Sequence, residues 1–162
     1  MKKFMMTLVA AMMAVTMNAQ NNFYVGGSLG LGFSTQSGVD ATYKIMPEFG
    51  ISFNEKMGVG TVIGYQKSGS EKFVFAPYFR YTACQAGPVS VFGDVQVGYE
   101  SYKGGGDNIT AGVKPGIAYS LNDKFSLVAK FGDIIGYDDN ASKISVLDLN
   151  FSNIQFGFFY NF

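Results

Sequence analysis

The sequence predicts an all-β fold, an eight-stranded antiparallel up-and-down transmembrane β-barrel preceded by a cleaved signal peptide. Three observations support this prediction: an apolar leader, a period-two alternation of apolar with small or polar residues, and turn residues between the alternating runs. The length of 162 residues suits a single compact domain. Charged residues make up only 15% of the chain. A soluble domain carries about 25%.

The leader occupies residues 1–19. Lys2 and Lys3 give it a basic start, and an uncharged apolar run follows from Phe4 to Met17. Ala19 is a small residue ahead of polar ones, so we expect cleavage after it and export of the chain. The apolar run of 14 residues is shorter than the ~20 that a spanning helix needs. The predicted organisation is a signal peptide at 1–19 and an outer membrane β-barrel at 20–162.

The mature chain contains runs in which apolar residues alternate with small or polar ones. These runs are residues 23–33, 43–53, 57–66, 73–82, 89–100, 110–121, 125–132 and 153–162. One face of each run carries Phe, Tyr, Val, Ile and Leu, and the other is rich in Gly, Ala and Ser. Every charge within the runs falls on the second face. Eight strands, each with two distinct faces, are therefore predicted.

The composition of the two faces decides which one points inward. The interior of an eight-stranded barrel has room for few bulky side chains, so the apolar face should point outward. Apolar outside and polar inside is the pattern of an outer-membrane barrel, the reverse of a soluble lipocalin-like barrel. The alternative is a secreted β-sandwich. A sandwich would expose a charged face on every strand, and several of the second faces carry no charge.

The connections fall into two lengths. Short turns are expected at 54–56, 84–88 and 122–124, and longer polar loops at 34–41, 67–72, 101–108 and about 133–150. This asymmetry indicates short periplasmic turns, one of them containing Cys84, and longer extracellular loops. Residues 47–56 and 115–124 resemble one another, which predicts a repeated hairpin. Outward prolines at 47, 77 and 115 each predict a bulge or bend.

Several segments carry a family resemblance: Pro-Tyr-Phe-Arg-Tyr at 77–81, Val-Phe-Gly-Asp at 91–94 and Tyr-Asn-Phe at 160–162. With the leader and the eight strands, they resemble the outer membrane β-barrel domain family. That family is similar to the OmpA transmembrane domain, OmpX and the opacity proteins of Gram-negative bacteria. The resemblance covers about 20–162 and implies a location in the cell outer membrane, in contact with its lipid and lipopolysaccharide. Phe158, Tyr160 and Phe162 resemble the C-terminal signal that the barrel assembly machinery reads.

The inward charges are the candidate functional residues. They are Glu48, Arg80, Asp94, Glu100, Lys114 and Lys130. Three acids balance three bases, and unpaired charges in a narrow lumen cost several kcal/mol each, so we expect pairs. Arg80 and Asp94 flank the turn at 84–88 and should be cross-strand neighbours, while Lys114 should approach Asp94 diagonally. Such a network either plugs the lumen or acts as a gate.

The composition excludes most other functions. The chain has no His, and the enzymatic outer-membrane barrels use one, so we expect no enzyme, no catalytic residue and no cofactor. A single Cys argues against a cysteine metal site, and 12 basic against 12 acidic residues argue against nucleic-acid binding. Two functions remain: a structural or surface-interaction protein that meets a partner through its loops, and a narrow gated porin-like channel for ions or very small solutes. A ligand pocket formed by loops 101–108 and 133–150 is a third.

Overall fold

The computed structural model describes residues 22–32, 42–68, 70–132, 134–138, 143–146 and 154–162. The predicted signal peptide at 1–19 and the predicted loop at 34–41 lie outside the described residues. The same is true of positions 139–142 and 147–150 in the predicted loop at 133–150. Among the residues that the structure describes, none belongs to a helix long and apolar enough to cross a membrane.

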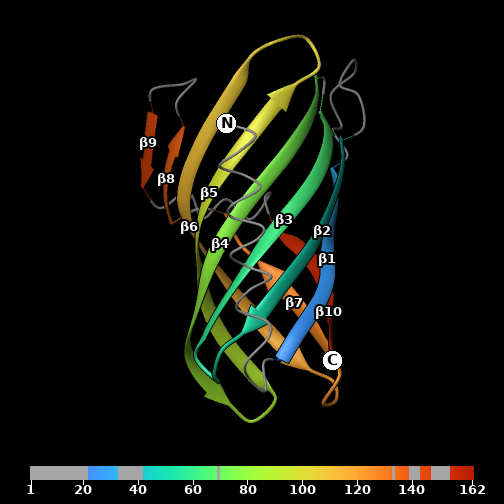
Figure 1. Cartoon of the computed structure of the whole chain (residues 1–162), viewed down its shortest axis with the longest axis vertical. Coiled ribbons are helices and arrows are strands. Elements are labelled where there is room, and N and C mark those ends of the chain that lie inside the picture. Colours follow the sequence, from blue (N-terminus) through green and yellow to red (C-terminus); the bar gives the residue numbers. More distant parts are fainter. Residues whose placement is uncertain (1–21, 33–41, 69, 133, 139–142, 147–153) are drawn as a thin grey trace.

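In the part of the chain that the structure describes, ten strand segments make up one antiparallel sheet. They are β1 (Asn22–Gly32), β2 (Thr42–Ser52), β3 (Met57–Ser68), β4 (Ser70–Ala86), β5 (Val89–Tyr102), β6 (Asp107–Ser120), β7 (Phe125–Lys130), β8 (Ile135–Asp138), β9 (Lys143–Val146) and β10 (Gln155–Asn161). Each strand from β1 to β7 pairs with the next, and β10 pairs with both β7 and β1 (Figure 1). The sheet therefore closes on itself, and the prediction of an eight-stranded antiparallel barrel is confirmed.

The seventh position of the barrel wall is shared by two segments. β7 pairs with β6 over residues 116–120, and β8 pairs with β6 over 110–113. Between them, Phe131 N donates to Pro115 O at 2.9 Å and Ile134 N donates to Val113 O at 2.9 Å. β9 in turn pairs with β8 beside the upper part of β6 (Figure 1). The prediction of a long polar loop at about 133–150 is therefore wrong where β8 and β9 form.

Other strands also extend beyond the residues in which apolar and polar side chains alternate. β3 ends at Ser68 and β4 begins at Ser70, so the predicted loop at 67–72 is wrong. The loop expected at 101–108 shrinks to 103–106, where Lys103 Nζ lies 2.6 Å from Glu71 Oε2. This hydrogen bond raises the pKa of the Lys103 ammonium. Backbone ladders need no apolar side chains, so a hairpin can continue into water beyond the point where alternation ends.

The turn between β4 and β5 is shorter than predicted. β4 continues to Ala86, and only Gly87 and Pro88 connect it to β5. Gly87 has a φ of 58°, a left-handed conformation that favours glycine. Cys84 therefore lies in the exposed end of a strand and not in a turn, which corrects the sequence prediction. The register between β4 and β5 shifts between Thr82 and Cys84.

The bulge predicted at Pro47 and at Pro77 does not form, although β3 has no register partner for Pro47 and β5 has none for Pro77. The pairing register is the same on both sides of Pro47 and of Pro77. At Pro115 the irregularity lies in the facing strand. Gly116 pairs with Lys130 and Val113 pairs with Ile135, so the seventh strand uses two extra residues there. Proline has no N–H to donate, and the facing strand is interrupted at this level.

The repeated hairpin is visible in the hydrogen bonds of two turns. Asn54 Oδ1 accepts from the backbone N of Lys56 and Met57, both at 2.8 Å. Asn122 Oδ1 accepts from the backbone N of Lys124 and Phe125, both at 2.9 Å. The two turns share one geometry because Asn can replace a backbone acceptor in a tight turn.

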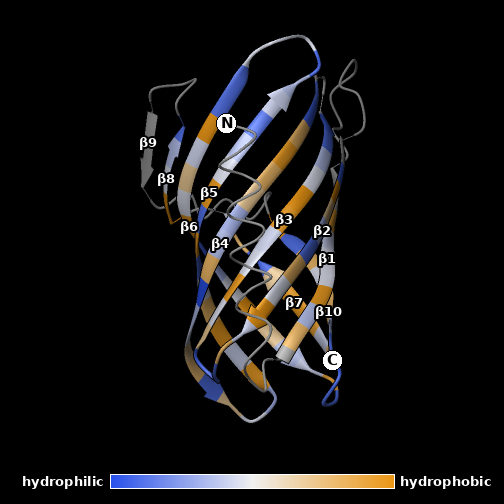
Figure 2. Ribbon diagram, in the orientation of Figure 1, coloured by the Kyte–Doolittle hydropathy of each residue, from blue (hydrophilic) through white to orange (hydrophobic). Residues whose placement is uncertain are grey.

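The two faces of the wall have the predicted orientation. Large apolar side chains are exposed on the outside, among them Phe23, Leu29, Ile45, Phe49, Phe79, Val95, Val97, Ile117, Leu127, Phe156 and Phe158. Apolar residues follow the strand walls, and hydrophilic residues gather at the turn and loop ends (Figure 2). The inside holds the buried charges Glu48, Asp94 and Lys130. The barrel is thus apolar outside and charged inside.

Candidate functional site

Four charged side chains from four strands meet in the middle of the lumen. Glu48 comes from β2, Arg80 from β4, Asp94 from β5 and Lys130 from β7. Alternation turns each of them inward, and closure of the ring brings together strands that are distant in sequence. The side chains of Glu48 and Asp94 are 2% and 1% exposed. We call these four residues the charge layer.

Arg80 and Asp94 form the predicted cross-strand pair. They are register partners on β4 and β5. Arg80 Nε donates to Asp94 Oδ1 and Arg80 Nη2 donates to Asp94 Oδ2, each at 2.7 Å. This two-bonded geometry between a guanidinium and a carboxylate is strong and directional.

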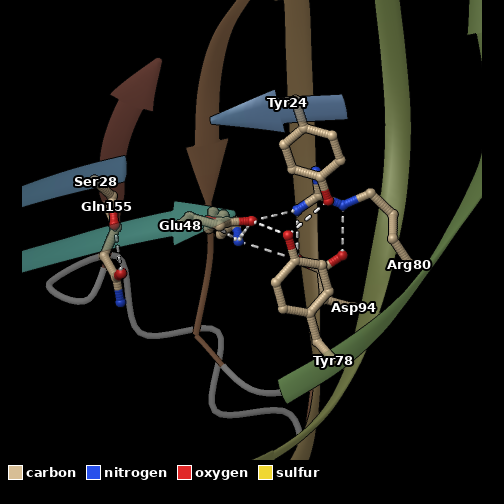
Figure 3. A network of polar contacts seen from close by, with 8 residues as sticks. Tyr24, Ser28, Glu48, Tyr78, Arg80, Asp94 and Gln155 are labelled. Carbon is tan, nitrogen blue, oxygen red and sulfur yellow. Dashed lines mark hydrogen bonds and ion pairs between the residues drawn. The ribbon is translucent and has the colours of Figure 1, made fainter. Parts of the chain in front are cut away.

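Glu48 joins this pair to the opposite part of the wall. Lys130 Nζ donates to Glu48 Oε1 at 2.8 Å and to Oε2 at 2.7 Å, and it lies 3.1 Å from Asp94 Oδ2. Arg80 Nη2 also donates to Glu48 Oε1, at 3.0 Å (Figure 3). Each base therefore contacts both acids, and the two bases and two acids sum to zero charge. Since β2, β4, β5 and β7 lie around the ring, the layer crosses the lumen.

Aromatic side chains that were not among the predicted site residues complete the layer. Tyr78 OH donates to Glu48 Oε1 at 2.5 Å, and the hydroxyls of Tyr24 and Tyr78 are 2.6 Å apart (Figure 3). The Arg80 guanidinium carbon lies 4.1 Å from the ring centre of Phe92 and 5.0 Å from that of Phe159. These distances permit cation–π attraction, which is stronger where water is excluded.

Glycines on the inner face make room for these rings. A Cβ atom at Gly50 would collide with the Tyr24 ring, and one at Gly60 would collide with the Tyr78 ring. The inner face, predicted to be filled by small side chains, is filled at this level by aromatic rings that lie over glycines. The signal was present in the sequence, because Tyr78 alternates in phase with Arg80, and Tyr24 alternates in phase with Gly26 and Ser28 on the small-residue face.

The other two predicted residues belong to a different part of the lumen. Glu100 Oε1 accepts from Lys72 Nζ at 2.8 Å, and its Oε2 accepts from Tyr102 OH at 3.0 Å. Lys72 had been expected in a loop. Lys114 is the register partner of Asp94, directly opposite and not diagonal as predicted. The six predicted charges thus divide between the charge layer and a second group toward the long-loop end.

The second group surrounds a cavity of about 300 Å³. Its charged lining residues are Lys44, Lys72, Glu100, Lys114 and Asp138. Met46, Val74 and Ala76, which form a buried apolar cluster, also line it. None of the four members of the charge layer does. The described residues include no group of three or more His, Cys, Asp or Glu side chains placed to hold a metal ion.

These features define a class: a closed eight-stranded antiparallel β-barrel with an apolar outer surface and a charged interior. No protein-family model matches the chain, and no curated protein matches it. A structure described as "De novo design of transmembrane beta-barrels" matches with a TM-score of 0.50 and 12% identity, over 87% of this chain and 95% of that chain. Neisserial surface protein A matches with a TM-score of 0.46 and 13% identity, over 88% of this chain and 94% of that one. The likeness to the designed barrel supports the fold alone.

Proposed function

We propose that the mature chain is an outer-membrane β-barrel with a structural or surface-interaction role and a lumen plugged by the charge layer. The outer surface supports the membrane location. Aromatic and aliphatic side chains such as Phe49, Val95 and Leu127 are 39%, 54% and 50% exposed. Exposed apolar side chains repeated around the whole wall are unfavourable in water and suit the hydrocarbon region of a bilayer.

The main support for a plugged lumen is the geometry of the charge layer. Its carboxylates are buried, each contacts two bases, and aromatic rings lie against the guanidinium. Breaking such a set leaves an uncompensated buried charge, so the paired arrangement is strongly favoured over an open one. The same pairing supports a non-enzymatic role, since these carboxylates are engaged in ion pairs.

The C-terminal strand supports export and assembly as an outer-membrane protein. Phe158 and Phe162 are exposed on the outer surface. Tyr160 contacts Phe162 and Phe125, with ring centres 4.8 Å and 5.0 Å apart, and Phe23 lies 5.5 Å from Phe162. This aromatic cluster at the short-turn end would be presented to the barrel assembly machinery and then to the lipid interface. Partners at the cell surface would meet the loops at the other end.

The alternative is a gated channel for ions or very small solutes. One observation favours it: Arg80 and Lys130 each contact both Glu48 and Asp94. The four groups can therefore exchange partners without leaving a charge unpaired, and an exchange that displaced the aromatic rings would open a path.

Planar-bilayer conductance distinguishes the two functions. The protein purified from membranes should insert without discrete openings, and Arg80→Ala should open or destabilise the barrel. Lys124→Ala, in an exposed turn, is the control and should match the wild type. Inserted wild-type protein with steady discrete openings would contradict the plug and favour the channel. Heat-dependent gel mobility of the same samples confirms that each variant is folded.

A further inference from the structure

The cavity above the charge layer has the size and composition of a binding site. Its volume of about 300 Å³ lies at the lower end of the range for small-molecule sites, ~300–1,000 Å³. It corresponds to the volume of about ten water molecules. The site therefore suits a compact polar ligand and not an acyl chain.

The lining residues come from six strand segments, β2 to β6 and β8. Lys44 on β2 is the register partner of Gln66 on β3, which is the partner of Lys72 on β4, which is the partner of Tyr102 on β5. All four of these side chains line the cavity. Lys114 from β6 and Asp138 from β8 complete the charged lining. Because the strands are fixed by backbone ladders, the donors are held in place before any ligand arrives.

The charge of the lining is positive. Three lysines face two acids, Glu100 and Asp138, and the charge layer beneath them is neutral. Lysine ammonium groups, phenol hydroxyls and side-chain amides are hydrogen-bond donors, and an ammonium accepts nothing. In a cavity partly shielded from water, an excess of positive charge attracts anions more strongly than on an open surface.

We propose that this cavity is a binding site for a small anion of the phosphate class, either free or as the headgroup of a lipid. Lysine is a common ligand of phosphate, which it binds as a point charge. The apolar side chains of Met46, Val74 and Ala76 form the rest of the wall and would contact the carbon part of a phosphorylated ligand. The site is independent of conduction, because it requires no path through the charge layer.

The test is titration of the purified, detergent-solubilised protein with inorganic phosphate, followed by ³¹P NMR. The wild type should bind saturably, and Lys114→Gln should weaken binding about tenfold or more, since it removes a charged donor. Lys124→Gln removes an exposed lysine at the opposite end of the barrel and should bind like the wild type. Glucose 6-phosphate should compete with phosphate, whereas glucose should not.

A second titration distinguishes a free phosphate from a lipid headgroup. In vesicles that contain phosphorylated lipopolysaccharide, a lower apparent affinity for inorganic phosphate identifies a lipid headgroup as the occupant. An unchanged affinity identifies a soluble anion, and both results uphold the site. The absence of saturable binding in a wild-type protein of native gel mobility would overturn the proposal. Equal weakening by Lys114→Gln and Lys124→Gln would overturn it as well.

Discussion

The two halves of the lumen are built from the same strands and differ in what crosses them. At the charge layer, Tyr24, Tyr78, Phe92 and Phe159 extend inward and pack around paired charges. Toward the long loops, the inward positions carry lysines, amides and small side chains, and a cavity of about 300 Å³ remains. An eight-stranded wall thus gives either a plug or a cavity. Aromatic rings over glycine decide which of the two forms.

The largest effect is expected from breaking the charge layer. Arg80→Met leaves Asp94 and Glu48 buried with one base between them, which should lower the free energy of unfolding by about 3–5 kcal/mol. Urea titration of the protein in lipid vesicles measures this loss. The double variant Arg80→Met/Asp94→Leu restores charge balance and should lose less than Arg80→Met alone. Equal losses would indicate that the pairing does not stabilise the barrel.

A charge placed on the outer surface should lower the free energy of unfolding somewhat less than the loss of Arg80 does. Val95 is 54% exposed near the middle of β5, and Val95→Lys should destabilise the barrel by about 2–4 kcal/mol in vesicles. Leu121, 57% exposed beside a short turn, provides the matched control, since Lys near the interface costs about 0–1 kcal/mol. If both substitutions proved neutral, the outer surface would not face hydrocarbon.

A methyl group added at the level of the charge layer should destabilise the barrel, whereas one added in an exposed loop should not. Gly60→Ala places a Cβ against the Tyr78 ring and should cost about 1–3 kcal/mol through overpacking. Gly104→Ala is the control, because nothing lies within 4 Å of a Cβ at that position. The same urea titration reports both, and a neutral Gly60→Ala would show that the ring is free to move.

The smallest effect is expected at the repeated turn. Asn122→Ala removes an acceptor for two backbone N–H groups and should cost about 1 kcal/mol. Asn54→Ala should cost the same, because its turn has the same geometry. Asn54→Asp and Asn122→Asp retain the acceptor oxygen, so their free energies of unfolding should stay close to that of the wild type. A large difference between the two Ala variants would contradict the structural equivalence of the turns.

Much of the fold could be predicted because period-two alternation specifies both the strand and its faces. The eight barrel positions followed from this alternation, and the outward apolar face followed from the composition of the two faces. The Arg80–Asp94 pair followed from the spacing of the two residues around a short turn. β8 and β9 could not be predicted in the same way. They are four-residue strands: β8 pairs with β6 beyond the interruption opposite Pro115, and β9 pairs only with β8 among the described strands.

The composition of the site was predicted only in part, because its contacts cross the barrel. Tyr78 and Glu48 are 30 residues apart, and Lys130 and Glu48 are 82 residues apart. Which inward side chains share a level depends on the stagger of the strands, and alternation alone does not specify that stagger. Lys72 was missed for another reason: β4 begins before its apolar residues do.

The contrast between a packed charge layer and an open cavity is tested most directly by measuring thiol accessibility at each level of the lumen. In a Cys84→Ser background, Thr110→Cys places a thiol in the cavity wall, and Ser28→Cys places one in the buried interior beside the charge layer. A charged, water-soluble thiol reagent should label Thr110→Cys readily and Ser28→Cys only after unfolding. Comparable labelling of both in the folded protein would mean that the interior beside the charge layer is open to water, and the packed plug would be wrong.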